Sequence, residues 1–134
     1  EYGKAEWIAK GEDIAILAEG HMLDAAYGAV ERLRAEGKNP SLVNIRFIRP
    51  LDGEILRAVA EDCSHIFTVE DNVRDGGFGS AVLEFYSDHD IAANVKNLAF
   101  PDVYIEQGTQ AQLFAKYGLD AEGIYQSIKK TLGE

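Results

Sequence analysis

The stretch GEDIAILAEG, residues 11 to 20, contains the longest apolar run of the chain, from Ile14 to Ala18. Its apolar residues are continuous rather than alternating with polar ones, which is the pattern of a strand covered on both faces. Strands of this kind occur in parallel sheets that lie between two layers of helices. The stretch therefore predicts an α/β fold in which it forms a central strand.

Three more apolar runs resemble this one. They lie at residues 42–45, at residues 66–69 and at residues 95–100, where the apolar character rises toward the end of the run. Residues 4–10 instead alternate between apolar and mainly polar side chains, as a half-exposed edge strand does. We thus expect one edge strand and four buried strands.

Helical periodicity separates these runs. The apolar faces of the predicted helices lie at residues 23–33, 55–60, 82–86, 113–117 and 124–132. Asp52 and Asp120 stand where N-caps of the second and last helices are expected, and Thr109 and Gln112 form a capping box before the fourth. The order of elements predicts an α/β sandwich around a mainly parallel sheet.

Length and composition limit the class of protein. The chain has 134 residues, which is the usual size of one domain, so we expect residues 1–134 to form a single domain. Because the chain opens with Glu1 rather than methionine, we expect this domain to be excised from a larger chain. A net charge of -10 repels phosphate backbones, which argues against nucleic acid or anionic membranes as partners. The lone cysteine, Cys63, fits a cytoplasmic protein.

The most conspicuous polar segment is EDNVRDGGFGS, residues 70–80, which runs from a strand end through glycines into a helix. It has two interpretations: a loop that binds phosphate at a helix N-terminus, or a tight turn whose exposed aromatic residue docks on a neighbour. We favour the second, because the segment matches no phosphate-binding motif and is itself acidic. The residues predicted to form this interface or structural turn are Gly76, Gly77, Phe78 and Gly79.

A second prediction concerns Arg46, which follows the strand at residues 42–45. An arginine at a strand end most often pairs with a nearby carboxylate, and we expect a structural ion pair between Arg46 and Glu70. No spacing of His, Cys, Ser or Asp typical of a metal centre or a nucleophile is present. The sequence therefore assigns no catalytic, cofactor-binding or metal-binding residue.

Four segments together resemble one family. They are GEDIAILAEG (11–20), VNIRFIRPLD (43–52), TVEDNVRDGGFGSAVLE (68–84) and FPDVYIEQGTQAQLFAKYGLDAEG (100–123). The second and third are similar to the C-terminal domains of transketolases in general. The last is more specific, and over essentially the whole chain the sequence resembles the C-terminal domain of 1-deoxy-D-xylulose-5-phosphate synthases.

The resemblance implies a fold and a parent activity. It implies a five-stranded mixed sheet of order 1-3-2-4-5, with the first strand antiparallel, flanked by helices in three layers. It also implies a parent enzyme that joins pyruvate to D-glyceraldehyde 3-phosphate with loss of carbon dioxide, for isoprenoid and thiamine synthesis. Thiamine diphosphate and magnesium would be held by other domains of that parent, since the G-D-G motif of the family does not occur here.

In such a parent this domain is expected to be architectural. It would pack against the other domains and against a second subunit of a homodimer, bind no cofactor itself and be inactive alone. Two alternatives stay open. The first is the C-terminal domain of a transketolase or of a 2-oxo acid dehydrogenase beta subunit, and the second is a free-standing regulatory module that binds a ligand at the strand ends.

Overall fold

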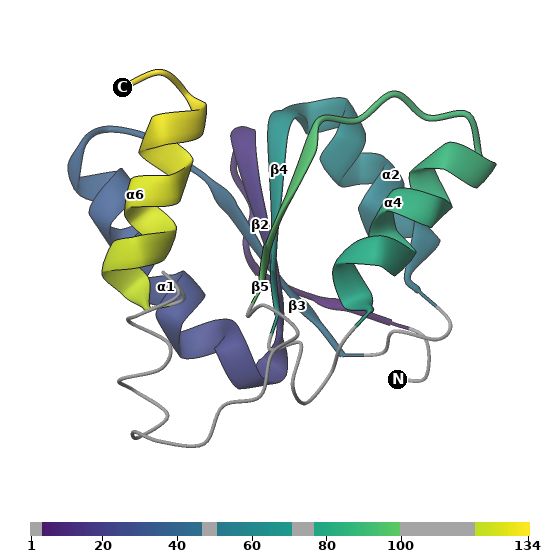
Figure 1. The fold of residues 1–134 in the computed structure, drawn as a ribbon, viewed down its shortest axis with the longest axis horizontal. Coiled ribbons are helices and arrows are strands. Elements are labelled where there is room, and N and C mark those ends of the chain that lie inside the picture. Colours follow the sequence, from purple (N-terminus) through teal and green to yellow (C-terminus); the bar gives the residue numbers. More distant parts are fainter. Residues whose placement is uncertain (1–3, 47–50, 71–76, 100–119) are drawn as a thin grey trace.

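The computed structural model describes residues 4–46, 51–70, 77–99 and 120–134. These residues form three layers, with a sheet between two pairs of helices (Figure 1). The strands are β1 (Glu6–Ala9), β2 (Asp13–Glu19), β3 (Ser41–Ile45), β4 (Cys63–Glu70) and β5 (Val95–Ala99). The helices are α1 (Leu23–Ala35), α2 (Gly53–Asp62), α4 (Phe78–Asp88) and α6 (Ala121–Thr131), with a short 3-10 helix, η1 (Gly20–Met22), before α1.

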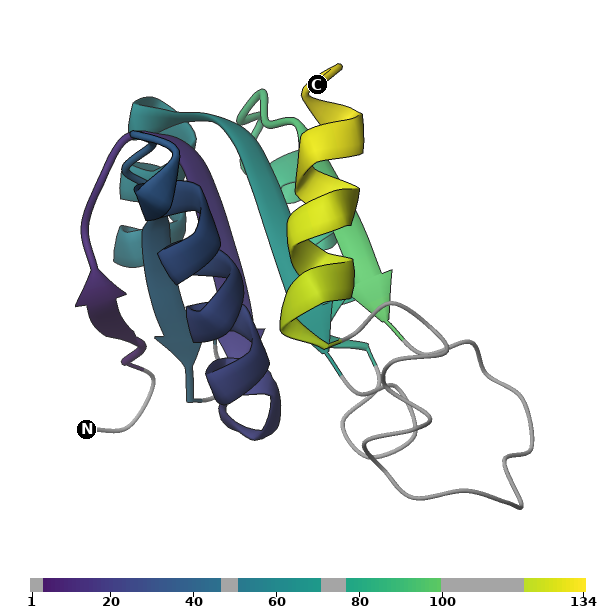
Figure 2. The ribbon, with the colours of Figure 1, turned by 90° about the vertical axis from the view of Figure 1, so that its left-hand side faces the viewer.

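Within the described residues the sheet has five strands in the order β1-β3-β2-β4-β5. The pairs of β2 with β3, of β2 with β4 and of β4 with β5 are parallel, whereas β1 is antiparallel to β3. The sheet order and the direction of the first strand are those implied by the family resemblance. The view in Figure 2 shows α1 and α6 side by side on one face of this sheet.

The pattern of β2 explains its place at the centre. Every residue from Ile14 to Glu19 is buried. Ile14, Ile16 and Ala18 point into the core under α1 and α6, while Ala15 and Leu17 point into the core under α2 and α4. Because successive side chains of a strand point to opposite faces, a continuous apolar run fills both cores at once.

Two helix starts are fixed by the predicted aspartates. The Asp52 carboxylate accepts the amide of Ile55 at 3.3 Å and also the amide of Ala5 at 2.9 Å, which ties the start of α2 to the segment before β1. The Asp120 carboxylate accepts the amide of Gly123 at 2.8 Å at the start of α6. The capping box predicted at residues 109–112 lies outside the described residues.

Strand β4 begins earlier than its apolar run predicts. It starts at Cys63 instead of Ile66, because its first residues pair in parallel with the start of β2. The register places Asp13 opposite Cys63 and Ile14 opposite His65, with an irregularity where Asp13 has φ of 68°. Backbone pairing with a neighbour thus extends this strand over residues whose side chains alone do not indicate a strand.

Helices α1 and α6 approach closely at a small-residue contact. A Cβ atom added to Gly28 on α1 would lie 2.7 Å from the Cβ of Ala121 on α6. Real carbon atoms do not approach so closely, so any larger residue at position 28 must push the two helices apart.

We therefore predict that Gly28→Ala destabilises the domain by about 1–3 kcal/mol through overpacking, measured by urea unfolding. The double variant with Ala121→Gly removes the clashing methyl group and should recover part of the loss. If Gly28→Ala unfolds at the same urea concentration as the natural chain, the close contact of the two helices does not exist in solution.

Candidate functional site

The carboxyl ends of the parallel strands lie at one edge of the sheet, where α1 and α4 begin (Figure 1). This is the edge at which ligands of open α/β sheets usually bind. The last residues of the four parallel strands are Glu19, Ile45, Glu70 and Ala99. We name this region the carboxyl edge.

Glu70 ends β4 and is buried, with 3% of its surface exposed. Its Oε1 accepts the amide of Phe78 at 2.9 Å, and its Oε2 accepts the amide of Gly79 at 2.8 Å. These amides belong to the first turn of α4, where backbone donors have no partner within the helix. The negative carboxylate also lies at the positive end of the helix dipole. The protein's own side chain therefore occupies the position that a bound anion would take.

The glycines of this turn serve its geometry. Gly77 precedes α4 with φ of 99°, a left-handed conformation that glycine adopts without steric cost. At Gly79 a Cβ would lie 2.6 to 2.9 Å from the side-chain amide of Asn97 on β5. Only a residue without a side chain lets α4 begin so near the sheet. Gly76, predicted to belong to the same turn, lies outside the described residues.

The prediction of an exposed Phe78 is wrong. Phe78 is fully buried, with 0% of its surface exposed, in the core under α2 and α4. It is the first residue of α4 and begins the stripe that continues with Val82 and Tyr86, each one turn further along the helix. Because α4 begins at Phe78, the aromatic ring belongs to the helix face that covers the sheet. It is not available as an anchor for a neighbouring protein.

The predicted ion pair between Arg46 and Glu70 is absent from the described part of the structure. Among the ion pairs of the described residues there is none between Arg46 and Glu70, and Arg46 is exposed. Strands β3 and β4 flank β2, so their ends are about 10 Å apart, while both oxygens of Glu70 face α4. Glu70 stabilises the start of α4 instead of pairing with Arg46.

Asn97 was not singled out by the sequence. Its Oδ1 accepts the hydroxyl proton of the buried Thr68, on the neighbouring strand, at 2.6 Å. The same side chain lies against Gly79. Cross-strand pairing alone brings these residues together, and an asparagine in an ordinary edge strand gives no signal for it. Glu70, Thr68 and Asn97 thus hold β4, β5 and α4 together at the carboxyl edge.

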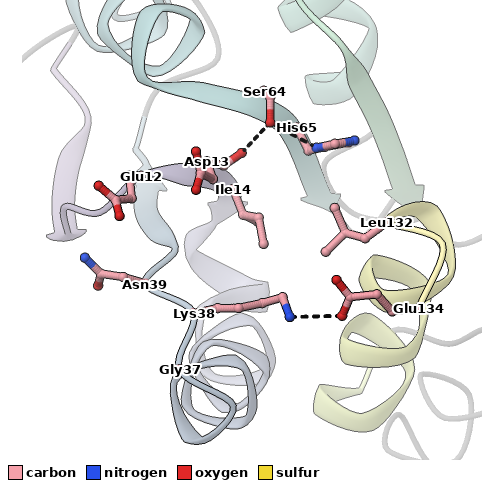
Figure 3. Close-up of a pocket in the computed structure, with 10 residues that line it drawn as sticks. All are labelled: Glu12, Asp13, Ile14, Gly37, Lys38, Asn39, Ser64, His65, Leu132 and Glu134. Atoms are coloured by element: carbon pink, nitrogen blue, oxygen red, sulfur yellow. Dashed lines mark hydrogen bonds and ion pairs between the residues drawn. The ribbon is translucent and has the colours of Figure 1, made fainter.

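A pocket of about 380 Å³ lies at the opposite edge of the sheet. Figure 3 shows its lining: the starts of β2 and β4, the turn after α1 and the end of α6. Ile14 and Leu132 supply apolar surface, and Lys38 and Glu134 form an ion pair at 2.9 Å. Ser64 lies 3.2 Å from His65 Nδ1 but donates to the carbonyl of Asp13 at 3.3 Å. We name this region the amino edge.

Two buried titratable groups lie in the core under α2 and α4. Burial raises the pKa of the Cys63 thiol, although a hydrogen bond with Ser41 acts in the opposite direction. Burial also raises the pKa of the Tyr86 phenol, whose hydroxyl donates to the Leu56 carbonyl at 2.7 Å. Both groups stay protonated at neutral pH, so the thiol is a buried apolar group rather than a nucleophile.

Within the described residues, no three or more His, Cys, Asp or Glu side chains are grouped so that they could hold a metal ion. No helix among those residues is long and apolar enough to cross a membrane. The 3-10 helix η1 contains His21 at the carboxyl edge. Of the buried polar atoms at this edge, Asn44 Oδ1 has no hydrogen-bond partner among the described residues.

Comparison with known proteins gives a consistent picture. The sequence profile of the family described as "Transketolase, C-terminal domain" matches residues 3–124. The 1-deoxy-D-xylulose-5-phosphate synthase of Syntrophotalea carbinolica is 47% identical over 127 residues, which are 95% of this chain and 20% of that protein. The synthase of Caldanaerobacter subterraneus is 44% identical over 126 residues, 94% of this chain and 20% of the relative. The chain therefore spans about a fifth of the length of these relatives.

Among solved structures, a split-gene transketolase described as an inactive beta4 tetramer superposes with a TM-score of 0.87. It is 31% identical in sequence, and the match covers 99% of this chain and 43% of the other. The likeness extends over all layers of the fold.

Since Phe78 is a core residue, we predict that Phe78→Ala lowers the free energy of unfolding of this chain by about 3–5 kcal/mol. Chemical denaturation measures it. Phe78→Leu retains most of the apolar volume and should lose clearly less. Equal stability of the alanine variant and the natural chain would mean that the ring lies outside the core.

For Glu70 we predict that replacement by alanine costs about 1–2 kcal/mol, since two amides of the first turn of α4 lose their acceptor. Glu70→Gln is the matched variant: it keeps one acceptor but directs an NH₂ group at the second amide, and should also destabilise. Arg46→Met is the control and should leave the denaturation midpoint unchanged. If Arg46→Met loses as much stability as Glu70→Ala, the main contact of Glu70 is the ion pair with Arg46 and not the start of α4.

Proposed function

The chain belongs to the transketolase C-terminal domain family, and we propose that it is the C-terminal packing domain of a 1-deoxy-D-xylulose-5-phosphate synthase. In this proposal the parent is a cytoplasmic, thiamine-diphosphate-dependent transferase that converts pyruvate and D-glyceraldehyde 3-phosphate to 1-deoxy-D-xylulose 5-phosphate and carbon dioxide. The domain contributes contacts to the rest of the parent and to a second subunit, and no reacting group.

One observation carries this proposal. Relatives that bear the name of the synthase are 47% and 44% identical to the chain over nearly its whole length, yet the chain spans only 20% of each. A match of this kind is expected for one domain of a multidomain enzyme. The remaining four-fifths of such an enzyme would hold the substrates.

The described residues do not fit the cofactor of the family. A diphosphate with its magnesium needs free amide donors and oxygen ligands, and the glycine-rich turn before α4 is where donors of this kind are expected. There, however, the amides of Phe78 and Gly79 already donate to Glu70. We therefore assign the thiamine diphosphate and magnesium sites to other parts of the parent, and no residue of this chain to either.

The architectural role is supported by the way the carboxyl edge is built. Glu70 accepts hydrogen bonds from the first turn of α4, and Asn97 accepts one from Thr68 on β4. These side chains therefore make this edge rigid instead of reactive. A rigid edge suits a surface on which another domain rests. The solved relative, described as a tetramer of beta chains, supports a role in subunit packing, and we propose a homodimer for the parent.

A second candidate is the C-terminal domain of a transketolase. It is favoured by the split-gene transketolase, whose structure covers 99% of this chain at 31% identity. The two candidates share the fold and the packing role and differ in the substrates of the parent.

A chimera tests the proposal. The matching 127-residue segment of the Syntrophotalea carbinolica synthase is replaced by this chain. We predict that the chimera assembles like the parent enzyme and forms product from pyruvate and D-glyceraldehyde 3-phosphate with thiamine diphosphate and magnesium. Sedimentation velocity and a product assay measure the two properties.

Two controls accompany the chimera. The isolated chain under the same conditions should form no product, and any product above background would refute the packing role. A chimera that contains Phe78→Ala should lose assembly and activity together, because its C-terminal domain does not stay folded. If the chimera with the unsubstituted chain folds but fails to assemble, the assignment to the synthase is contradicted. If a chimera made in the same way from a transketolase shows transketolase activity, the second candidate is favoured.

A further inference from the structure

A closed ring of four charged side chains joins the ends of α1 and α6 at the amino edge. Lys38 Nζ lies 2.9 Å from Glu134 Oε1, and Lys129 Nζ lies 2.7 Å from the same oxygen. Lys129 Nζ also lies 2.6 Å from Glu36 Oε1, and Lys38 Nζ closes the ring at 3.7 Å from that oxygen. Each carboxylate thus contacts two ammonium groups, and the ring has no net charge. We name these four residues the ion ring.

The ring connects two helix ends of the same type. After α1, the amide of Lys38 donates to the Leu33 carbonyl at 3.1 Å, and Gly37 has φ of 88°. After α6, the amide of Glu134 donates to the Lys129 carbonyl at 2.9 Å, and Gly133 has φ of 81°. Both ends are Schellman motifs, in which a left-handed glycine directs the next residue back along the helix. Lys38 and Glu134 occupy the same position in the two motifs, which is why their side chains meet.

The attachment of α6 changes along its length. Its buried residues are Ile124, Tyr125 and Ile128, and the last of these begins the final turn of the helix. From Lys129 to Glu134 no described residue is buried, although Leu132 packs partly against the core. The helix up to Ile128 is therefore held by buried apolar side chains, and residues 129–134 by the ion ring together with the partly buried Leu132.

We propose that the ion ring is a latch, which holds residues 129–134 over the amino-edge pocket and can open without unfolding of the domain. Two of the four ring residues, Lys38 and Glu134, line the pocket of about 380 Å³ together with Leu132, so the ring forms one side of its wall. Figure 3 shows the pair of Lys38 and Glu134 beside the facing side chains of Ile14 and Leu132. When residues 129–134 move away, Leu132 withdraws and the pocket becomes an open groove over Ile14.

The charge states of the ring agree with this proposal. Hydrogen bonds to Glu134 and Glu36 raise the pKa of the Lys129 ammonium above its ordinary value. Hydrogen bonds from Lys129 and Lys38 lower the pKa of the Glu134 carboxyl. A carboxyl group whose pKa is lowered by folding stabilises the folded state at pH values above its ordinary pKa, and this stabilisation is lost on acidification. An ammonium group whose pKa is raised by folding stabilises the folded state at pH values below its ordinary pKa, and this stabilisation is lost at alkaline pH. Both shifts move these pKa values away from the neutral range, so salt rather than pH is the means to weaken the pairs of Lys129 and Glu134 there.

Amide hydrogen exchange on the isolated chain, followed by NMR, tests the latch. In Lys129→Gln the amides of Leu132, Gly133 and Glu134 should exchange about three- to tenfold faster than in the natural chain, as expected for the loss of one or two partly exposed ion pairs. Lys38→Gln should accelerate the same amides although residue 38 is outside α6, which separates the ring from an effect on helix propensity. Salt at about 1 M should accelerate them in the natural chain and have a smaller further effect in each variant, which keeps only the two contacts of its remaining lysine.

The single thiol distinguishes local opening from unfolding. Cys63 is buried and belongs to the core on the opposite face of the sheet, so its reaction with a thiol reagent reports global unfolding. We expect an unchanged rate of this reaction in both variants. Glu31→Gln is the matched control, since it removes the exposed pair of Glu31 and Arg34 on α1 and leaves the ring intact. Unchanged amide exchange in Lys129→Gln, or a parallel rise in thiol reactivity, would overturn the proposal.

Discussion

Strand β2 must be apolar on both faces, and the rest of the fold depends on this constraint. It is hydrogen-bonded to β3 along one edge and to β4 along the other, and helices cover both of its faces. Each residue from Ile14 to Ala18 is nearly or completely inaccessible to water. A polar side chain at any of these positions would be buried without a partner, whichever face it pointed to. The helices on either side have a common surface to pack on only because this strand is uniformly apolar.

The ends of the helices decide what each edge of the sheet can do. At the carboxyl edge, the start of α4 is capped by the Glu70 carboxylate from the neighbouring strand end. At the amino edge, the ends of α1 and α6 terminate in equivalent glycine motifs whose following residues pair with each other. In both places, backbone groups that a ligand could use are satisfied by the chain itself. The domain is thus suited to form a stable surface for larger assemblies, which agrees with the packing role that we propose.

The glycine-rich turn shows how sequence reasoning can identify a residue and misjudge its contacts. Glu70 and Phe78 were both singled out, since one ends a strand and the other stands between glycines. An aromatic residue flanked by glycines has few local neighbours to cover it, which suggested exposure. In the structure, Phe78 is buried by residues of α2 and of the sheet, which are distant in sequence. The pairing of Glu70 was misjudged for the same reason: the sequence gives the distance along the chain, while the direction in which a buried carboxylate points depends on the backbone around it.

The sequence by itself determined the layers, the strand positions and the caps at Asp52 and Asp120, because each depends on local periodicity or on a side chain within one turn of its target. Together with the family resemblance, it also indicated the sheet order. The tertiary structure alone decided that Glu70 caps α4, that Asn97 lies against Gly79 and that the ends of α1 and α6 are joined by an ion ring. Each of these contacts joins residues that no short-range pattern relates. They form because the packing of the two apolar faces of the sheet fixes where the strand and helix ends come together.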